Sequence, residues 1–161
     1  MSKPILSLDF DGVLHLYSKG WQSGALYDPI TDGFFEWAEE AVKTLKLVVF
    51  SSRSKDIRNI DDMCEWYLNQ LVEYEEATGR VVADEVRYMD FVQHKPTAFL
   101  TIDDRGLTFT GNWSDFPPAE LIKFKPWNLK PDFTVTNKTI TFDVSHKIRP
   151  EDVDKLFHHQ V

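Results

Sequence analysis

Two acidic residues, Asp9 and Asp11, flank Phe10 at the end of the first apolar run of the chain. Residues two apart in a strand point to the same side, so both carboxylates can line one crevice. One carboxylate of such a pair can attack phosphorus, while the other donates a proton to the departing oxygen and later activates water. Gly12 follows and lets the backbone approach a ligand closely. The pattern favours a two-step hydrolysis, although Asp and Gly are also common in turns that merely end a strand.

A second group of polar side chains follows the apolar run at residues 47–50. The Ser51 hydroxyl is suited to donate a hydrogen bond to a phosphoryl oxygen. Ser51, Ser52 and Ser54 are also suited to cap a helix, and neighbouring serines can divide these two roles. Lys95 either balances the negative charge of nucleophile and substrate or is an ordinary solvated lysine, which the local sequence favours.

Asp103 and Asp104 close a third apolar run, at residues 99–102. Two adjacent acids repel each other unless a cation or a basic partner such as Arg105 lies close. Magnesium accepts carboxylates, carbonyl oxygens and waters, and it screens the approach of an anionic nucleophile to a phosphate. The pair therefore indicates a Mg2+ site.

Four segments, taken in order, resemble the motifs of the haloacid dehalogenase (HAD) superfamily: Asp9-Phe10-Asp11-Gly12-Val13, Ser51, Lys95 and Ile102-Asp103-Asp104. The resemblance spans roughly residues 5–127 and implies a Rossmann-like core, with Asp9 as nucleophile and Asp11 as general acid/base. It implies two further sets of residues, which are phosphate-binding Gly12, Ser51, Ser52, Arg53 and Lys95, and metal-ligating Asp9, Asp11, Asp103 and Asp104. The presence of Asp11 favours the phosphatases of the superfamily over its dehalogenase branch.

A finer resemblance rests on the runs Ser51-Ser52-Arg53, Lys95-Pro96 and Asp103-Asp104-Arg105. They look similar to small bacterial and phage phosphatase-like members, some related to capsule-biosynthesis or polynucleotide-end phosphatases. One departure is that only seven residues separate Lys95 from Asp103, too few for the helix that usually carries the family's lysine. Lys95 must therefore reach the site from a loop, and Arg53 is the alternative source of positive charge. Which of Asp103 and Asp104 ligates the metal directly is left open.

The elements that must position these residues alternate between strand and helix, as in a parallel sheet with helices on both faces. A central buried strand is expected at residues 5–10, and further strands at 47–50, 81–86, 99–102 and, at the edge, 107–110. Helices are expected over residues 34–45, with Asp32 as the cap, and from residue 57 to an end at Gly79, with a helical turn beginning at Pro117. The expected fold class is α/β, a Rossmann-like HAD core with a small cap or none.

The tail of the chain differs from this core. Residues 133–136 and 139–144 are β-rich runs whose connection suits a hairpin, and a short helix is expected over 150–159. We therefore expect a HAD-like catalytic domain at residues 1–130 and a hairpin-helix extension at 131–161 on the same domain. The superfamily core does not require this extension, which either packs on the sheet edge or mediates a homo-dimer.

Composition restricts the partners. A chain of 161 residues suits one domain, and its net charge of -8 opposes binding to nucleic acid. The amino terminus lacks the features of a signal peptide and no run approaches a membrane-spanning length, so we expect a cytoplasmic protein without membrane contact. Because no insertion is long enough for a large cap, the loop at residues 13–29, with Trp21 and Tyr27, is expected to exclude water.

These observations predict a Mg2+-dependent phosphomonoester hydrolase that acts through an aspartyl-phosphate on Asp9, with a phosphorylated small molecule as substrate. One alternative is a polynucleotide-end (3'-phosphate) phosphatase, whose bases the aromatic loop would stack. Another is a catalytically silent phosphate-binding module. No chemistry is assigned to four histidines without metal-ligand spacing, His94, His146, His158 and His159.

Overall fold

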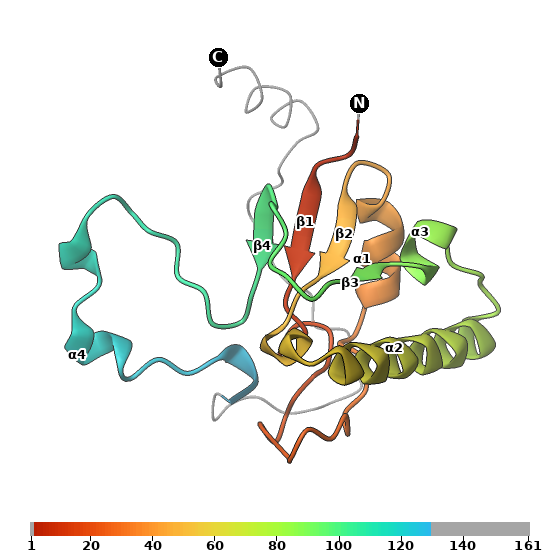
Figure 1. Cartoon of the computed structure of the whole chain (residues 1–161), viewed down its shortest axis with the longest axis horizontal. Coiled ribbons are helices and arrows are strands. Elements are labelled where there is room, and N and C mark those ends of the chain that lie inside the picture. The colour runs from red at the N-terminus through yellow and green to blue at the C-terminus, as the bar shows by residue number, and fades with distance from the viewer. Residues whose placement is uncertain (1, 130–161) are drawn as a thin grey trace.

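The computed structural model describes residues 2–129. They form a four-stranded sheet with helices beside it (Figure 1). The strands are β1 (Ile5–Leu8), β2 (Lys46–Val49), β3 (Asp90–Phe91) and β4 (Leu100–Ile102). They lie in the order β3-β2-β1-β4, and every neighbouring pair is parallel. The predicted α/β class with a parallel sheet is therefore confirmed.

The first strand is central, as predicted. β1 pairs with β2 on one side and β4 on the other, and Leu6 faces Leu47 and Leu100 in the two neighbouring strands. Leu6 and Leu8 are buried on one face of the strand and Ser7 on the other, as expected for a strand covered on both faces. The strand ends at Leu8, two residues earlier than its apolar run suggested.

The two longer helices are α1 (Phe34–Ala41) and α2 (Ile57–Thr78). The side chain of Asp56 accepts a hydrogen bond from the Arg58 N–H at the start of α2, and Gly79 ends the helix in the left-handed conformation, as predicted. The rings of Phe35 and Tyr74 pack with centroids 4.7 Å apart and join the helices into one core. The helix expected at residues 34–45 is shorter than its apolar pattern, and its N-cap is Gly33, so the prediction of Asp32 as the cap is wrong.

One predicted strand, at residues 81–86, is wrong. The short helix α3 (Asp84–Arg87) lies there instead, and β3 follows it. The N–H of Val82 donates to Glu75 Oε1 at 3.0 Å, so it is not available to a sheet ladder. Val82 and Val86 are both buried four residues apart, a spacing that a helical turn satisfies as well as an apolar strand does.

The link from β3 to β4, residues 92–99, contains no helix, so Lys95 lies in a loop as expected. The long connection between β1 and α1 also lacks helices and strands longer than single bridges, which confirms the predicted loop at residues 13–29. Both connections border the carboxyl end of the sheet. The connection between β1 and α1 also contacts Asp11 through His15.

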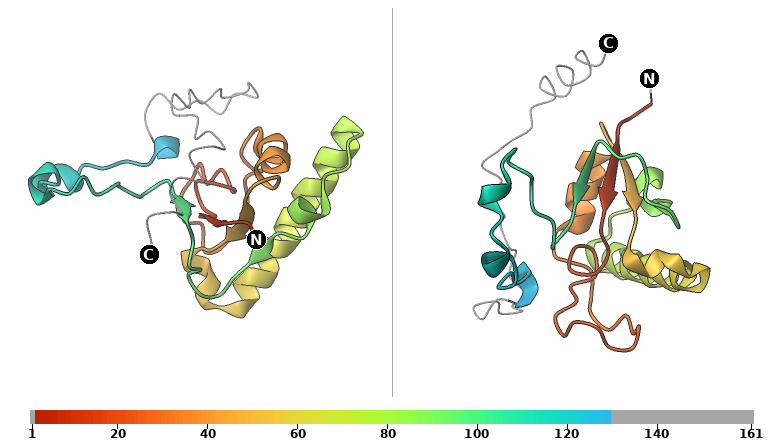
Figure 2. Two further views of the ribbon diagram at one scale, coloured as in Figure 1. Left: turned by 90° about the horizontal axis from the view of Figure 1, so that it is seen from above. Right: turned by 60° about the vertical axis from the view of Figure 1, so that its left-hand side comes forward.

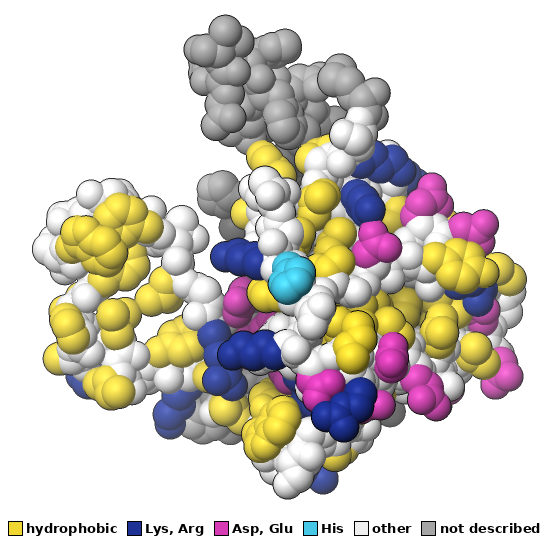
Figure 3. Space-filling view, viewed as in Figure 1, with side chains coloured by type: hydrophobic (Ala, Val, Ile, Leu, Met, Phe, Trp, Pro, Cys, Tyr) yellow, Lys and Arg dark blue, Asp and Glu magenta, His cyan; other side chains and the backbone are white. Residues whose placement is uncertain are grey.

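After β4 the chain runs outward and then returns to the loop that follows β1 (Figures 1 and 2). The outlying part carries η2 (Trp113–Asp115) and α4 (Pro118–Leu121), and η3 (Trp127–Leu129) lies on the return path. Residues 107–110, predicted as an edge strand, are irregular. Apolar side chains gather on this outlying segment (Figure 3), where the Phe109 and Trp113 rings pack with centroids 4.8 Å apart.

The predicted hairpin at residues 133–144 and helix at 150–159 lie outside the described residues, as does the whole of the proposed 131–161 extension. Its packing, and the division from residues 1–130, stay predictions. None of the helices in residues 2–129 combines the length and apolar composition needed to cross a bilayer.

Two leucines of α2 test this packing. Leu71 is fully buried and Leu68 is 43% exposed. We expect Leu71→Ala to lower the free energy of unfolding by about 2–5 kcal/mol, because it removes buried methyl groups and leaves a cavity. Leu68→Ala, the matched control, should cost at most about 1 kcal/mol. Urea denaturation measures both, and equal losses would contradict the orientation of α2.

Candidate active site

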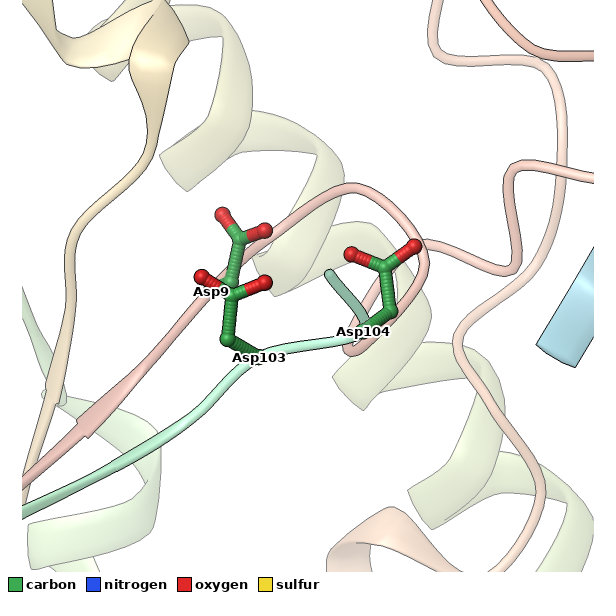
Figure 4. Close-up of side chains that lie close together, drawn as sticks. All are labelled: Asp9, Asp103 and Asp104. Carbon is green, nitrogen blue, oxygen red and sulfur yellow. The ribbon is translucent and has the colours of Figure 1, made fainter. Parts of the chain in front are cut away.

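Three carboxylates converge at the carboxyl ends of β1 and β4. Leu8 and Ile102 are paired across these strands, and the Asp9 N–H donates to the Ile102 carbonyl at 2.9 Å, so Asp9 and Asp103 emerge side by side. One oxygen from each of Asp9, Asp103 and Asp104 lies within 4.8 Å of the others. Figure 4 shows the three side chains projecting to the same side of the backbone. We call these residues the acidic triad.

Asp104 is the member of the triad whose surroundings most require a cation. Its side chain is 1% exposed, and neither carboxylate oxygen has a hydrogen-bond partner among residues 2–129. Arg105 Nε lies 3.6 Å from Oδ2 and forms an ion pair with Asp104 without a hydrogen bond. Burial and the charge of Asp103 raise the pKa of Asp104 above its ordinary value. An ionised carboxylate in such a place is stabilised by a bound divalent cation, so the donor set fits Mg2+.

Gly12 makes room for Asp104. Its φ is 81°, and a Cβ on Gly12 would lie within 3.0 Å of the Asp104 carboxylate. The Gly12 carbonyl accepts a hydrogen bond from Trp127 Nε1 at 2.8 Å, which ties the returning segment to this turn. The close backbone approach expected at Gly12 is therefore made to an acid of the triad, while its predicted contact with phosphate stays a prediction.

Asp9 is half-buried, and this burial is the main reason why its pKa rises from 3.8 to about 7. The Phe10 N–H donates to Asp9 Oδ1 at 2.8 Å and acts in the opposite direction, while the charges of Asp103, Asp104 and Asp11 add to the rise. Without a cation, the predicted nucleophile therefore holds its proton below about pH 7. A divalent cation beside it would favour the ionised form.

Asp11 lies outside the triad, although it is only two residues from Asp9. Because β1 ends at Leu8, strand alternation no longer decides where Asp11 points. Arg53 donates to it from Nε at 2.6 Å and from Nη2 at 3.1 Å, and His15 Nδ1 lies 2.9 Å from Oδ1. Burial alone would raise the pKa of Asp11, but the hydrogen bonds from His15 and Arg53 outweigh it and lower that pKa. The metal-ligating role expected for Asp11 stays a prediction.

His15 is the residue that sequence reasoning missed. Its ring is fully buried, and Nε2 accepts a hydrogen bond from the Asp28 backbone N–H at 3.2 Å. Since an amide N–H can only donate, Nε2 carries no proton and the ring proton lies on Nδ1, where it is donated to Asp11. The signal in the sequence is a histidine four residues after an acid, inside the apolar run from Leu14 to Leu16.

The predicted phosphate ligands after β2 are used in local contacts. The Ser51 side chain caps η1 (Ser52–Lys55) by accepting the Arg53 N–H, and the Ser54 hydroxyl accepts the Ser51 N–H. The capping alternative is thus confirmed for Ser51, whose hydroxyl proton is still free to be donated. Ser52 is exposed, and Lys95 is exposed without an ion pair to any of residues 2–129. The phosphate-binding roles of these residues stay predictions.

Gly12→Ala tests the contact with Asp104, and Gly20→Ala is its matched control. Both glycines have positive φ, but a Cβ at Gly20 meets nothing within 4 Å. Each substitution should cost about 1–2 kcal/mol for the left-handed backbone. Gly12→Ala should cost roughly 1–3 kcal/mol more, because it displaces Asp104. Urea denaturation at neutral pH gives both values, and similar losses would argue against the close approach.

The raised pKa of Asp9 predicts how stability depends on pH without divalent cations. Below pH 3.8 the folded and unfolded chains are both protonated at Asp9, and between 3.8 and about 7 only the unfolded chain releases this proton. Asp9 therefore lowers the free energy of unfolding progressively across this range, and fully above it. Asp9→Asn removes the effect, so its advantage in Tm should grow from pH 4 to pH 8 in EDTA. A constant difference would contradict the raised pKa.

The structure confirms two features that the resemblance predicts. They are a parallel four-stranded sheet with flanking helices, and an acidic triad at the carboxyl ends of its strands. No family model, no curated protein and no solved structure matches this chain.

Proposed function

We propose that this chain is a Mg2+-dependent phosphomonoester hydrolase of the HAD type, with Asp9 as the nucleophile. The observation that carries the proposal is the acidic triad, because two neighbouring strands bring three carboxylates together and bury one of them without a hydrogen-bond partner among residues 2–129. Ligands of parallel sheets bind at this carboxyl edge. The order of the sequence motifs supports the same conclusion independently.

The residues that would hold Mg2+ are Asp9, Asp103 and Asp104. Their oxygens are the hard donors that this ion prefers. The strongest single indication is that the two Asp104 oxygens have no hydrogen-bond partner in the described part of the chain. When bound, Mg2+ supplies positive charge that offsets the approach of an anionic nucleophile to an anionic phosphate.

The side chains divide the reaction into two steps. In the first, the Asp9 carboxylate attacks phosphorus, the bond to the ester oxygen breaks, and Asp11 gives that oxygen a proton. In the second, water attacks the aspartyl-phosphate, Asp11 accepts the proton of the water, and Asp9 is released with inorganic phosphate. Asp11 is thus regenerated in its protonated form after each cycle.

The contacts of Asp11 favour one of these two roles over the other. Hydrogen bonds from His15 and Arg53 lower its pKa, which suits a base that accepts a proton from water. To act as the acid of the first step, Asp11 must carry a proton and give up part of this hydrogen bonding. The arrangement of Arg53 is therefore a determinant of the reaction.

Ser51 and Lys95 are the proposed phosphate ligands. Three of the N–H groups of Arg53 already donate to protein oxygens, whereas Lys95 is exposed in the 92–99 loop. This difference favours Lys95 as the positive charge that meets the phosphate.

Hydrolysis by purified protein tests the proposal. Native chain, Asp9→Asn and the matched control Asp62→Asn, which changes an exposed acid of α2, are assayed with Mg2+ or EDTA over phosphorylated metabolites and a 3'-phosphate oligonucleotide. We expect Mg2+-dependent release of phosphate by the native chain and the control, and a loss of roughly 10³-fold or more for Asp9→Asn. Folded native protein that hydrolyses no ester, or undiminished turnover by Asp9→Asn, would refute the proposed function.

A further inference from the structure

Asp11 is held by two side chains that both extend to the loop following β1. Arg53 binds both oxygens of the Asp11 carboxylate and His15 binds Oδ1. Each of the two side chains also contacts the segment 18–28, which we call the flap. The proposed mechanism assigns no role to this connection. It offers a physical path between the position of the flap and the orientation of Asp11.

The Arg53 contact reaches the tip of the flap. Nε and Nη2 donate to Asp11, while Nη1 donates to the Gly24 carbonyl at 2.8 Å. The guanidinium also lies over the Trp21 ring, 4.8 Å from its centroid. The Arg53 side chain is only 5% exposed, although Trp21 itself is 62% exposed. The flap tip therefore covers the guanidinium that orients Asp11.

The His15 contact reaches the base of the flap instead. Nδ1 donates to Asp11, and Nε2 accepts from the Asp28 N–H. Trp66, which belongs to helix α2, anchors this end of the flap because its Nε1 donates to the Asp28 carbonyl at 3.1 Å. This end of the flap is consequently fixed to the core, and His15 holds Asp11 whatever the tip does.

The tip, residues 19–25, has mainly internal contacts. Tyr27 Oη donates to the Gly20 carbonyl at 2.7 Å, and the Ala25 N–H donates to the Gln22 carbonyl at 2.9 Å. The hydrogen bond that these seven residues receive from outside the loop comes from Arg53, which donates to the Gly24 carbonyl. A displacement of the tip would thus remove two of the groups that fix the guanidinium plane, the Gly24 carbonyl and the Trp21 ring.

We propose that Arg53 is a positioning residue that couples the flap tip to the orientation of Asp11. With the tip closed, the guanidinium is fixed on three sides and its planar fork sets both oxygens of Asp11. With the tip displaced, the guanidinium keeps only its fork to Asp11, so His15 still holds Asp11 but Arg53 fixes its orientation less tightly. This inference rests on the proposed function for its catalytic meaning, but the coupling itself is a property of the fold.

Coupling is reciprocal, so a change at Asp11 must also loosen the tip. Hydrogen exchange at the Gly20 and Ala25 amides of the full chain measures this without any substrate. We expect Asp11→Asn and Arg53→Lys each to raise exchange at these amides by about tenfold or more, which corresponds to about 1.4 kcal/mol. The amides of β1 report whether the core stays intact and should be unchanged.

Trp21→Ala provides a further variant, in which the substituted side chain is itself exposed rather than buried. It should raise tip exchange in the same way, and it should lower kcat more than it changes KM, because the ring acts through Arg53 on Asp11. Trp113→Ala, at another exposed tryptophan that is 79% exposed on the outlying segment, is the matched control and should change neither quantity.

The outcomes separate this inference from the proposed function. Tip exchange that is unchanged in Asp11→Asn, Arg53→Lys and Trp21→Ala would overturn the coupling, even if the native chain hydrolyses phosphate esters. Faster tip exchange in all three variants supports the coupling even if no ester is hydrolysed, in which case the proposed function alone fails. Equal effects of Trp21→Ala and Trp113→Ala on both exchange and kcat would also overturn it.

Discussion

Electrostatic repulsion among Asp9, Asp103 and Asp104 is the constraint on which the site depends. Their oxygens approach within 4.8 Å, and Asp104 lies almost wholly out of solvent without a hydrogen-bond partner among the described residues. Burial raises the pKa of Asp9, and the charges of Asp103 and Asp104 add to the rise. Arg105 offsets part of the charge of Asp104, and protons or a divalent cation can compensate the rest. The site is thus built to exchange one for the other.

The sheet makes this crowding unavoidable. Parallel pairing of Leu8 with Ile102 leaves Asp9 and Asp103 at the same level of two neighbouring strands, and Asp104 then turns under the loop at Gly12. A glycine is required there because any side chain would enter the space of the Asp104 carboxylate. Leu6 and Leu8 are buried on one face of β1 and Ser7 is buried on the other, so core packing and the geometry of the site depend on the same strand.

Asp9 and Asp11 are close in sequence but have opposite electrostatic surroundings. Burial and neighbouring acids raise the pKa of Asp9, whereas hydrogen bonds from His15 and Arg53 lower that of Asp11. Pairs of carboxylates with such different surroundings are suited to different roles in one reaction. Here the difference arises because β1 ends at Leu8, after which the chain turns toward Arg53.

The amino-acid sequence by itself determined the parallel α/β class, the central place of β1 and the meeting of Asp9 with Asp103 and Asp104, because these follow from apolar periodicity and from where strands end. It predicted a strand at residues 81–86 wrongly, since Val82 and Val86 fit a helical turn equally well. Only the tertiary structure decided that Arg53 binds Asp11 and that His15 takes part. Both contacts depend on how the loop after β1 lies against Arg53 and helix α2, a long-range arrangement that no local pattern specifies.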